Sequence, residues 1–217
     1  MTDKQASNTS SAPRIYLAGP DVFLPNARDV GHAKCARVAA VGGVGVFPLD
    51  AELELTGLPP YEAARRIALA NEDLMRSCDG MVANLSPFHG VSMDSGTAFE
   101  VGFMRALGRP IEAYTSTPDD YATRARAWRA TNAAPVAGAY DRNGQEADGA
   151  LEIEDFGLSE NLMIAIGVAD GGGAMTIGDG QETPFRDADA FEVAVTRLVA
   201  RLNGAPPRTS ASGARVR

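Results

Sequence analysis

The chain has 217 residues, which is enough for one substantial hydrophobic core, so a single domain is the default expectation. Acidic residues outnumber basic ones by 28 to 20, and the net charge of −8 argues against a nucleic-acid polymer or an anionic membrane as a partner. The two cysteines lack metal-ligand spacing, which favours a reducing compartment, and no apolar run approaches the length of a transmembrane helix. We therefore expect a cytoplasmic protein.

Both ends of the chain are predicted to lie outside the folded domain. Residues 1–13 are rich in Ser, Thr and Asn and lack the apolar segment of a signal peptide. Residues 204–217 are rich in Pro, Ser and Arg. We expect disordered tails at these two ends and one domain over residues 14–203.

Between the tails, short apolar segments alternate with segments whose apolar residues recur at helical spacing. The predicted strands are 14–18, 44–47, 80–85 and 111–114. The predicted helices are 26–41, 61–77, 94–107, 118–129, 158–168 and 187–202. This alternation predicts an α/β fold, with a parallel sheet covered by helices on both faces. Two glycine-rich segments, 131–155 and 171–184, are predicted to be loops, the first of them a mobile segment over the site.

The helix predicted after the third strand carries an unusual acid. Between Asp94 and Arg105, Glu100 is the one ionisable side chain, and its neighbours are apolar or small. In open α/β sheets, ligands bind beyond the carboxyl ends of the strands, where this helix begins. Gly96 and Gly102 each cost about 1 kcal/mol relative to alanine, which suggests that another group approaches the helix backbone closely. Glu100 is therefore a candidate for chemistry, with an unpaired surface residue as the alternative.

The other motifs in the sequence do not indicate a specific binding or catalytic site. Gly43-Val44-Gly45 precedes a strand and lacks the third glycine of a dinucleotide-binding fingerprint, and there is no Gly-Lys-Ser/Thr phosphate loop. His89 lies in a predicted loop without a nucleophile elbow, so a solvated histidine is the simpler reading. No spacing of acids, histidines or cysteines asks for a metal. We expect neither a metal nor a cofactor.

Two further acids deserve comparison with Glu100. Asp94 opens the same helix, where capping and the helix dipole favour an acid, and capping alone would explain its presence. Asp73 lies on the preceding helix, where the pattern alone favours an exposed pair with Arg76, three residues further on.

Four segments resemble the nucleoside 2-deoxyribosyltransferase family in their order and spacing. These segments are Ile15-Tyr16-Leu17-Ala18-Gly19-Pro20-Asp21-Val22-Phe23, Asn71-Glu72-Asp73-Leu74, Asp94-Ser95-Gly96-Thr97-Ala98-Phe99-Glu100-Val101-Gly102 and Asn161-Leu162-Met163. The resemblance covers residues 15–163. It implies a flavodoxin-like three-layer sandwich with a five-stranded parallel sheet.

The resemblance also implies a reaction, the transfer of a 2-deoxyribosyl group between nucleobases, which is nucleoside salvage chemistry. Glu100 would be the nucleophile, Asp73 would exchange a proton with the base, and Asp94 would hold the sugar hydroxyls and help orient Glu100. The partners would be a nucleoside, a free nucleobase and further copies of the chain in a homo-oligomer with shared active sites. The implied substrate-binding residues come from the first strand and its loop and from a segment that reaches a neighbouring subunit: Tyr16, Gly19, Asp21, Phe23, Asn161 and Met163.

These residue types suit the cleavage of an N-glycosidic bond. The reaction builds an oxocarbenium-like centre, and a retaining route needs a carboxylate nucleophile and a separate proton donor. An alternative is an N-glycosidase that hydrolyses a nucleoside or a nucleoside monophosphate, for which Ser92 and Ser95 are the nearby hints of a phosphate pocket. A non-enzymatic flavodoxin-like binding module is disfavoured, because the first strand has no acid to receive a phosphoryl group or a metal.

Overall fold

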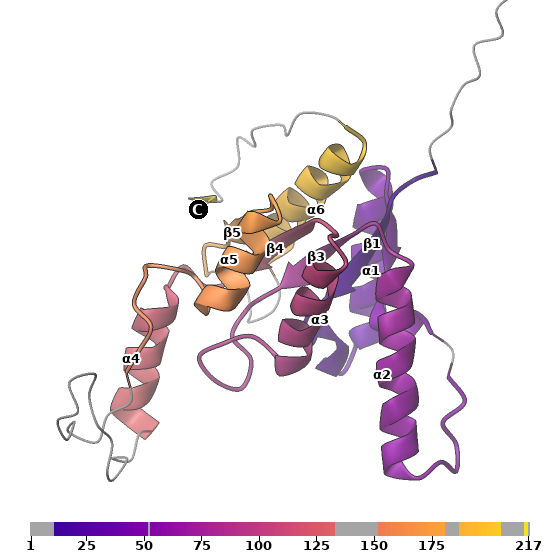
Figure 1. The fold of residues 1–217 in the computed structure, drawn as a ribbon, viewed down its shortest axis with the longest axis horizontal. Helices are drawn as coiled ribbons and strands as arrows, with labels where there is room; N and C mark the ends of the chain where they lie inside the picture. The colour runs from indigo at the N-terminus through magenta and orange to yellow at the C-terminus, as the bar shows by residue number, and fades with distance from the viewer. Residues whose placement is uncertain (1–10, 52, 133–151, 181–186, 205–214, 217) are drawn as a thin grey trace, which may run out of the picture.

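A central sheet with helices on both faces makes up the computed structural model of this chain (Figure 1). The structure describes residues 11–51, 53–132, 152–180, 187–204 and 215–216. The strands are β1 Arg14–Ala18, β2 Val44–Val46, β3 Gly80–Asn84, β4 Ile111–Thr115, β5 Met175–Ile177 and β6 Arg215–Val216. The helices are α1 Ala27–Ala40, α2 Pro60–Arg76, α3 Ser95–Ala106, α4 Tyr121–Asn132, α5 Leu162–Asp170 and α6 Ala188–Leu202, with short 3-10 helices η1 Pro20–Phe23 and η2 Pro48–Asp50. None of the described helices combines the length and the hydropathy needed to span a bilayer.

The strand order in the sheet is β2-β1-β3-β4-β5-β6. The first five strands are parallel, and β1 lies between β2 and β3, with Tyr16 opposite Val46 on one side and Met81 on the other. The parallel part has the order 2-1-3-4-5, which is that of flavodoxin-like folds. The predicted α/β class and flavodoxin-like architecture are therefore confirmed.

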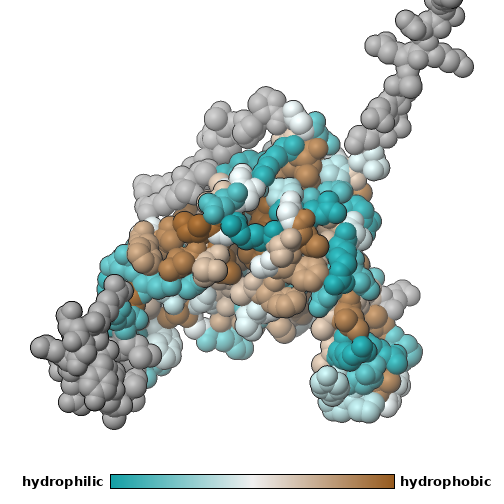
Figure 2. All heavy atoms as spheres, in the orientation of Figure 1, coloured by the Kyte–Doolittle hydropathy of each residue, from teal (hydrophilic) through white to brown (hydrophobic). Residues whose placement is uncertain are grey.

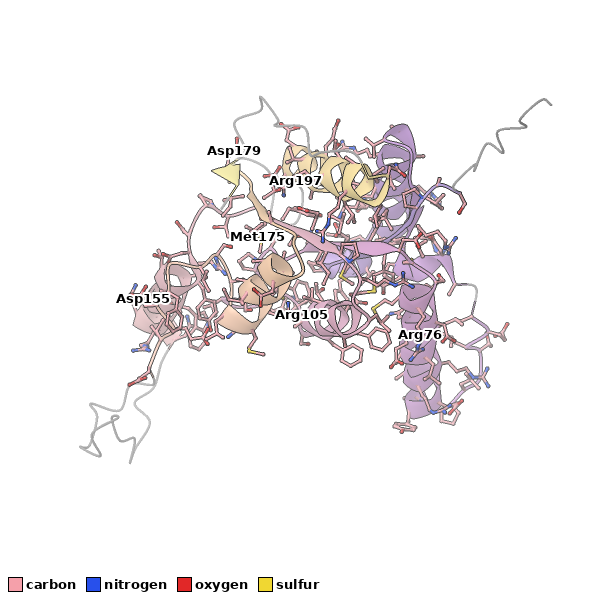
Figure 3. The ribbon with its side chains drawn as sticks, turned by 45° about the horizontal axis from the view of Figure 1, so that its top comes forward. Arg76, Arg105, Asp155, Met175, Asp179 and Arg197 are labelled. Atoms are coloured by element: carbon pink, nitrogen blue, oxygen red, sulfur yellow. The ribbon has the colours of Figure 1, made fainter. Side chains whose placement is uncertain are left out.

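The two faces of the sheet carry separate hydrophobic clusters because side chains alternate along each strand. Ile15 and Leu17 pack with α1 and α6, whereas Tyr16 and Ala18 pack with the face covered by α2, α3 and α5. Figure 3 shows the same layers, with α6 on one side of the sheet and α3 and α5 on the other. Tyr16 therefore points toward the helix that carries Glu100.

The prediction of a loop over residues 171–184 is wrong at its centre, where β5 forms. This strand has three residues, all buried, which is too short to give a periodic signal. Gly173 precedes it, and a Cβ there would lie 1.7 Å from the carbonyl oxygen of Ile111. The glycine that suggested a loop is thus what allows β5 to lie close to β4.

Two predicted helices begin later than expected because a side chain caps each of them. The helix predicted over 118–129 begins at Tyr121, after Asp120 Oδ1 accepts a hydrogen bond from the Thr123 amide at 2.7 Å. The helix predicted over 158–168 begins at Leu162, after its N-cap Asn161.

Part of the expected tail at 204–217 is structured. The two residues of β6 pair antiparallel with β5, so within the described residues the five parallel strands that were expected gain a sixth, antiparallel strand at one edge. Most of both expected tails and most of the segment 131–155 lie outside the described residues.

Candidate active site

The side chain of Glu100 meets Tyr16 between α3 and the sheet. Tyr16 Oη donates a hydrogen bond to Glu100 Oε1 at 2.7 Å. The tyrosine is fully buried, and burial together with the nearby carboxyl raises the pKa of its phenol, so it remains a donor. Glu100 is therefore a paired side chain and not a solitary surface residue.

The protonation of Glu100 is set mainly by its burial. Desolvation raises the pKa of its carboxyl to about 7, the Tyr16 hydrogen bond acts in the opposite direction, and the negative charge of Asp94 adds to the rise. A carboxyl whose pKa is displaced toward neutrality by burial and by a neighbouring acid is a frequent feature of active sites.

Asp94 is the N-cap of α3 and lies close enough to influence Glu100. Its Oδ2 accepts hydrogen bonds from the Thr97 amide at 3.0 Å and the Thr97 hydroxyl at 3.3 Å. A Cβ at Gly96 would lie 2.9 Å from the same oxygen, so this glycine makes room for the cap. At Gly102 nothing described lies within 4 Å of such a Cβ. The close approach expected from the two glycines is found at Gly96 alone.

Asp73 lies on the last turn of α2 with its side chain 78% exposed. It forms an ion pair with Arg76 at 2.9 Å, which is the pairing that the sequence pattern favoured. Arg76 in turn lies over the ring of Phe103, 5.0 Å from its centroid, on the helix of Glu100. Among the described contacts no hydrogen bond or ion pair joins Asp73 to Glu100, so the structure does not bring these two acids into contact.

Asp21 faces the opposite side of the sheet from Glu100. Its Oδ2 accepts hydrogen bonds from Lys34 Nζ at 2.6 Å and from Asn84 Nδ2 at 3.2 Å, and Lys34 also donates to Tyr114 Oη at 2.8 Å. Asp21, Lys34 and Tyr114 line a cavity of about 330 Å³ against α1 and α6. Burial lowers the pKa of Lys34, although Asp21 counteracts this effect. The structure therefore does not bring Asp21 to Glu100.

Gly19 and Asn84 bring the carboxyl ends of β1 and β3 together. Gly19 has φ +150°, and a Cβ there would lie 2.6 Å from Cβ of Asn84. Asn84 is fully buried, and its Oδ1 accepts a hydrogen bond from the Ser86 amide at 3.2 Å. We did not predict a role for Asn84 from the sequence. The available signal was a polar residue at the end of a buried strand, on the edge where ligands bind.

Phe23 belongs to an aromatic row that follows β1 and β3. The residue is 61% exposed, and its ring stacks on Phe88 at 5.1 Å between centroids, while Phe88 stacks on His89 at 4.0 Å. His89 has φ +53°, which is uncommon for a residue other than glycine. The row presents an aromatic surface at the end of η1.

Asn161 caps its own helix within the chain. Its Oδ1 accepts a hydrogen bond from the Met163 amide at 3.0 Å, and its Nδ2 donates to Glu154 Oε2 at 2.8 Å. Met163 points outward and is 74% exposed. No described contact connects either residue to Glu100 of the same chain.

A flavodoxin-like sheet with a partly buried, protonatable carboxyl on the helix that follows its third strand defines an α/β protein with a candidate site for acid–base or nucleophilic chemistry. No group of three or more His, Cys, Asp or Glu among the described residues could hold a metal ion. The family model for nucleoside 2-deoxyribosyltransferases matches residues 15–163. The chain belongs to this family, whose members act on small nucleosides and nucleobases, and it is an enzyme of that kind: a deoxyribosyltransferase or a related N-glycosidase.

Similar proteins are found among sequences and solved structures. The uncharacterised protein C191.05c of Schizosaccharomyces pombe is 31% identical over 198 residues, which cover 88% of this chain and 90% of that protein. A 2-desoxiribosyltransferase from Leishmania mexicana is 28% identical with a TM-score of 0.49, covering 84% of this chain and 97% of that one. The CMP N-glycosidase BcmB of Clostridium botulinum is 18% identical with a TM-score of 0.32, covering 47% and 71%.

Proposed function

We propose that this enzyme transfers a 2-deoxyribosyl group between nucleobases through a covalent intermediate on Glu100. The observation that supports this role is the Glu100 carboxyl itself, which is partly buried, accepts the Tyr16 hydrogen bond at 2.7 Å and has a pKa raised to about 7 by desolvation. Near neutral pH a large fraction of this group is ionised, and an ionised carboxylate with little hydration is an effective nucleophile.

The proposed reaction has two displacements. In the first, a Glu100 oxygen bonds to C1′ of the deoxyribose, the bond from C1′ to the base nitrogen breaks, and Asp73, protonated after leaving its ion pair with Arg76, gives its proton to the departing base. In the second, a nitrogen of the incoming base bonds to C1′, the ester to Glu100 breaks, and Asp73 takes the proton that the incoming base loses. Asp94 binds the sugar hydroxyls, and Tyr16 holds Glu100 in place. Two successive displacements retain the configuration at C1′.

A base-exchange assay tests the proposal. The enzyme is incubated with a deoxynucleoside, with and without a second free base, and the products are separated by chromatography. We expect a new deoxynucleoside that requires the second base. Glu100→Ala should lower its formation by several orders of magnitude, whereas Glu62→Ala, which removes a surface carboxylate on α2, should not. A Glu100→Ala enzyme with more than a few per cent of wild-type turnover would exclude the nucleophile role.

The same assay detects hydrolysis, in which water takes the place of the second base. Release of free deoxyribose at an equal rate with and without the second base would show an N-glycosidase. Ser92 is a weaker indication of a phosphate pocket than the sequence suggested, because its hydroxyl donates a hydrogen bond to Glu160 at 2.5 Å. The match to the nucleoside 2-deoxyribosyltransferase family model also favours a nucleoside over a nucleotide as the substrate.

We also propose that the active unit is an oligomer in which Asn161 and Met163 serve the site of a neighbouring copy. Exposed apolar side chains gather on α3 and α5, where Phe99 is 58% and Ile166 is 45% exposed, beside the outward-pointing Met163. Figure 2 shows hydrophobic surface over these two helices. An exposed apolar surface of this kind is typical of a protein–protein contact, and a second copy of the chain would remove it from water.

A complementation experiment tests the shared site. Glu100→Ala and Asn161→Ala enzymes should each be nearly inactive, and a mixed dimer would contain one intact site and one doubly altered site. After random exchange of subunits between two-fold dimers, about a quarter of the wild-type activity should return. No return of activity under conditions that demonstrably exchange subunits, or a fully active monomer, would contradict the shared site.

A further inference from the structure

Glu160, a buried carboxylate outside the proposed catalytic set, joins separate segments of the chain. It is 1% exposed, and its Oε1 accepts hydrogen bonds from the Ser92 hydroxyl at 2.5 Å and from the Asn161 amide at 3.0 Å. The backbone of Met93 also donates a hydrogen bond to this carboxylate. One side chain therefore holds both the loop that precedes α3 and the residue that caps α5.

Arg124 of α4 completes the arrangement. It donates to Glu160 Oε2 at 3.0 Å, to the Ser159 carbonyl at 3.0 Å and to the Val91 carbonyl at 2.8 Å. The side chains of Arg124 and Glu160 are 9% and 0% exposed. Removing two charges from water costs roughly as much as their attraction returns, so a buried pair of this kind is weak evidence for added stability. The several hydrogen bonds of this pair do, however, fix the orientation of both side chains.

The contacts of Glu160 lie at two helix N-termini, one carrying Asp94, the proposed sugar-binding residue of this chain's own site, and the other carrying Asn161, proposed to serve the site of a neighbouring copy. Asp94, the cap of α3, follows Met93 directly, and Asn161, the cap of α5, follows Glu160 directly. The helices α3 and α5 also pack against each other. We propose that Glu160, oriented by Arg124, is a positioning residue that fixes Asp94 and Asn161 relative to each other. This inference rests on the proposed function, because it takes the roles of these two residues from it.

The chain offers a matched control in the ion pair between Glu112 and Arg197. These side chains are 5% and 13% exposed, and their charged atoms lie 2.8 Å apart. Arg197 belongs to α6, so this pair lies on the face of the sheet opposite α3 (Figure 3). Glu112→Gln thus disturbs a comparable buried pair without touching Asp94 or Asn161.

Kinetics in two backgrounds test the inference. Ser92→Ala removes one hydrogen bond from Glu160 and leaves the Arg124 pair intact, so the protein is expected to fold. In the wild-type background it should lower kcat/KM about tenfold, because small displacements of a binding group are costly. In an Asp94→Asn background, Ser92→Ala should change kcat/KM by less than about twofold. The reason is that Ser92→Ala acts by moving Asp94, and the interaction of Asp94 with the substrate is already altered in this background. Glu112→Gln should have equal effects in both backgrounds. Equal effects of Ser92→Ala in the two backgrounds would overturn the inference.

Hydrogen exchange provides a readout that needs no activity. The Thr97 amide reports the cap at Asp94, and the Met163 amide reports the cap at Asn161. Ser92→Ala and Glu160→Gln should both speed exchange at these two amides, and Glu112→Gln should not. Unchanged exchange at both amides in Ser92→Ala would overturn the positioning role. If the wild-type enzyme cleaves no deoxynucleoside, the proposed function fails, while this exchange comparison still decides whether Glu160 holds the two caps.

Discussion

Replacing Glu100 by glutamine should stabilise the folded enzyme above neutral pH. The pKa of the folded carboxyl is about 7, above its ordinary value of 4.5, so the folded state binds this proton more tightly than the unfolded state does. The resulting stabilisation is present in full below pH 4.5 and is lost as the pH rises through 7. A difference between pKa values of about 7 and 4.5 corresponds to about 3 kcal/mol, at about 1.4 kcal/mol per pKa unit. Glutamine has no proton to lose in this range and still accepts the Tyr16 hydrogen bond.

Urea denaturation at one fixed protein concentration measures the effect. The free energy of unfolding of Glu100→Gln minus that of the wild type should increase by about 3 kcal/mol between about pH 4.5 and about pH 8. Glu62→Gln removes an exposed carboxylate of the α2 surface and serves as the control for loss of one negative charge. A difference between Glu100→Gln and the wild type that stays constant over this pH range would refute the reasoning, because it would show that burial does not penalise the ionised form of Glu100.

Three further outcomes are expected. Tyr16→Phe removes the hydrogen bond that lowers the pKa of Glu100, so the acid limb of the pH–rate profile should move to higher pH. An acid limb at the wild-type pH would show that Tyr16 does not lower the pKa of Glu100. Asp73→Asn should slow base exchange about a hundredfold or more, as loss of a general acid does. Glu72→Gln alters the other partner of Arg76 and should slow base exchange only a few-fold. Equal losses in the two variants would mean that the ion pairs with Arg76 matter and that proton transfer by Asp73 does not. From its family, the enzyme should have a higher kcat/KM for deoxyadenosine than for adenosine, and equal values in a direct comparison would contradict this.

Much of the fold could be predicted from local pattern. The buried strands β1, β3 and β4 have five residues each and stand out as apolar runs between glycines and prolines. Glu100 could be singled out because a lone acid in an apolar helix is visible along the chain. By contrast, β5 has three residues and β6 has two, and both gain their stability from pairing with distant strands. Such short pairings leave no periodic signal.

The directions of the polar side chains were harder to predict. Asp21 lies in a loop that resembles a substrate loop, yet its carboxylate is bound by Lys34 from α1 and points to the other face of the sheet. No role for Glu160 could be predicted, because its partners Arg124 and Ser92 lie 36 and 68 residues away in the chain. Contacts of this kind follow from the packing of whole helices, which no short window of sequence contains.

The burial of Lys34 has a practical consequence for protein chemistry. Lys4 and Lys34 are the two lysines of the chain, and the ammonium of Lys34 is held inside by Asp21 and Tyr114. Its nitrogen must leave both partners before it can attack an acylating reagent. Acetylation mapped to Lys34 by mass spectrometry therefore reports how often this nitrogen is released from Asp21 and Tyr114. A single-residue label of this kind follows the polar contacts at the sheet's carboxyl edge without any engineered probe.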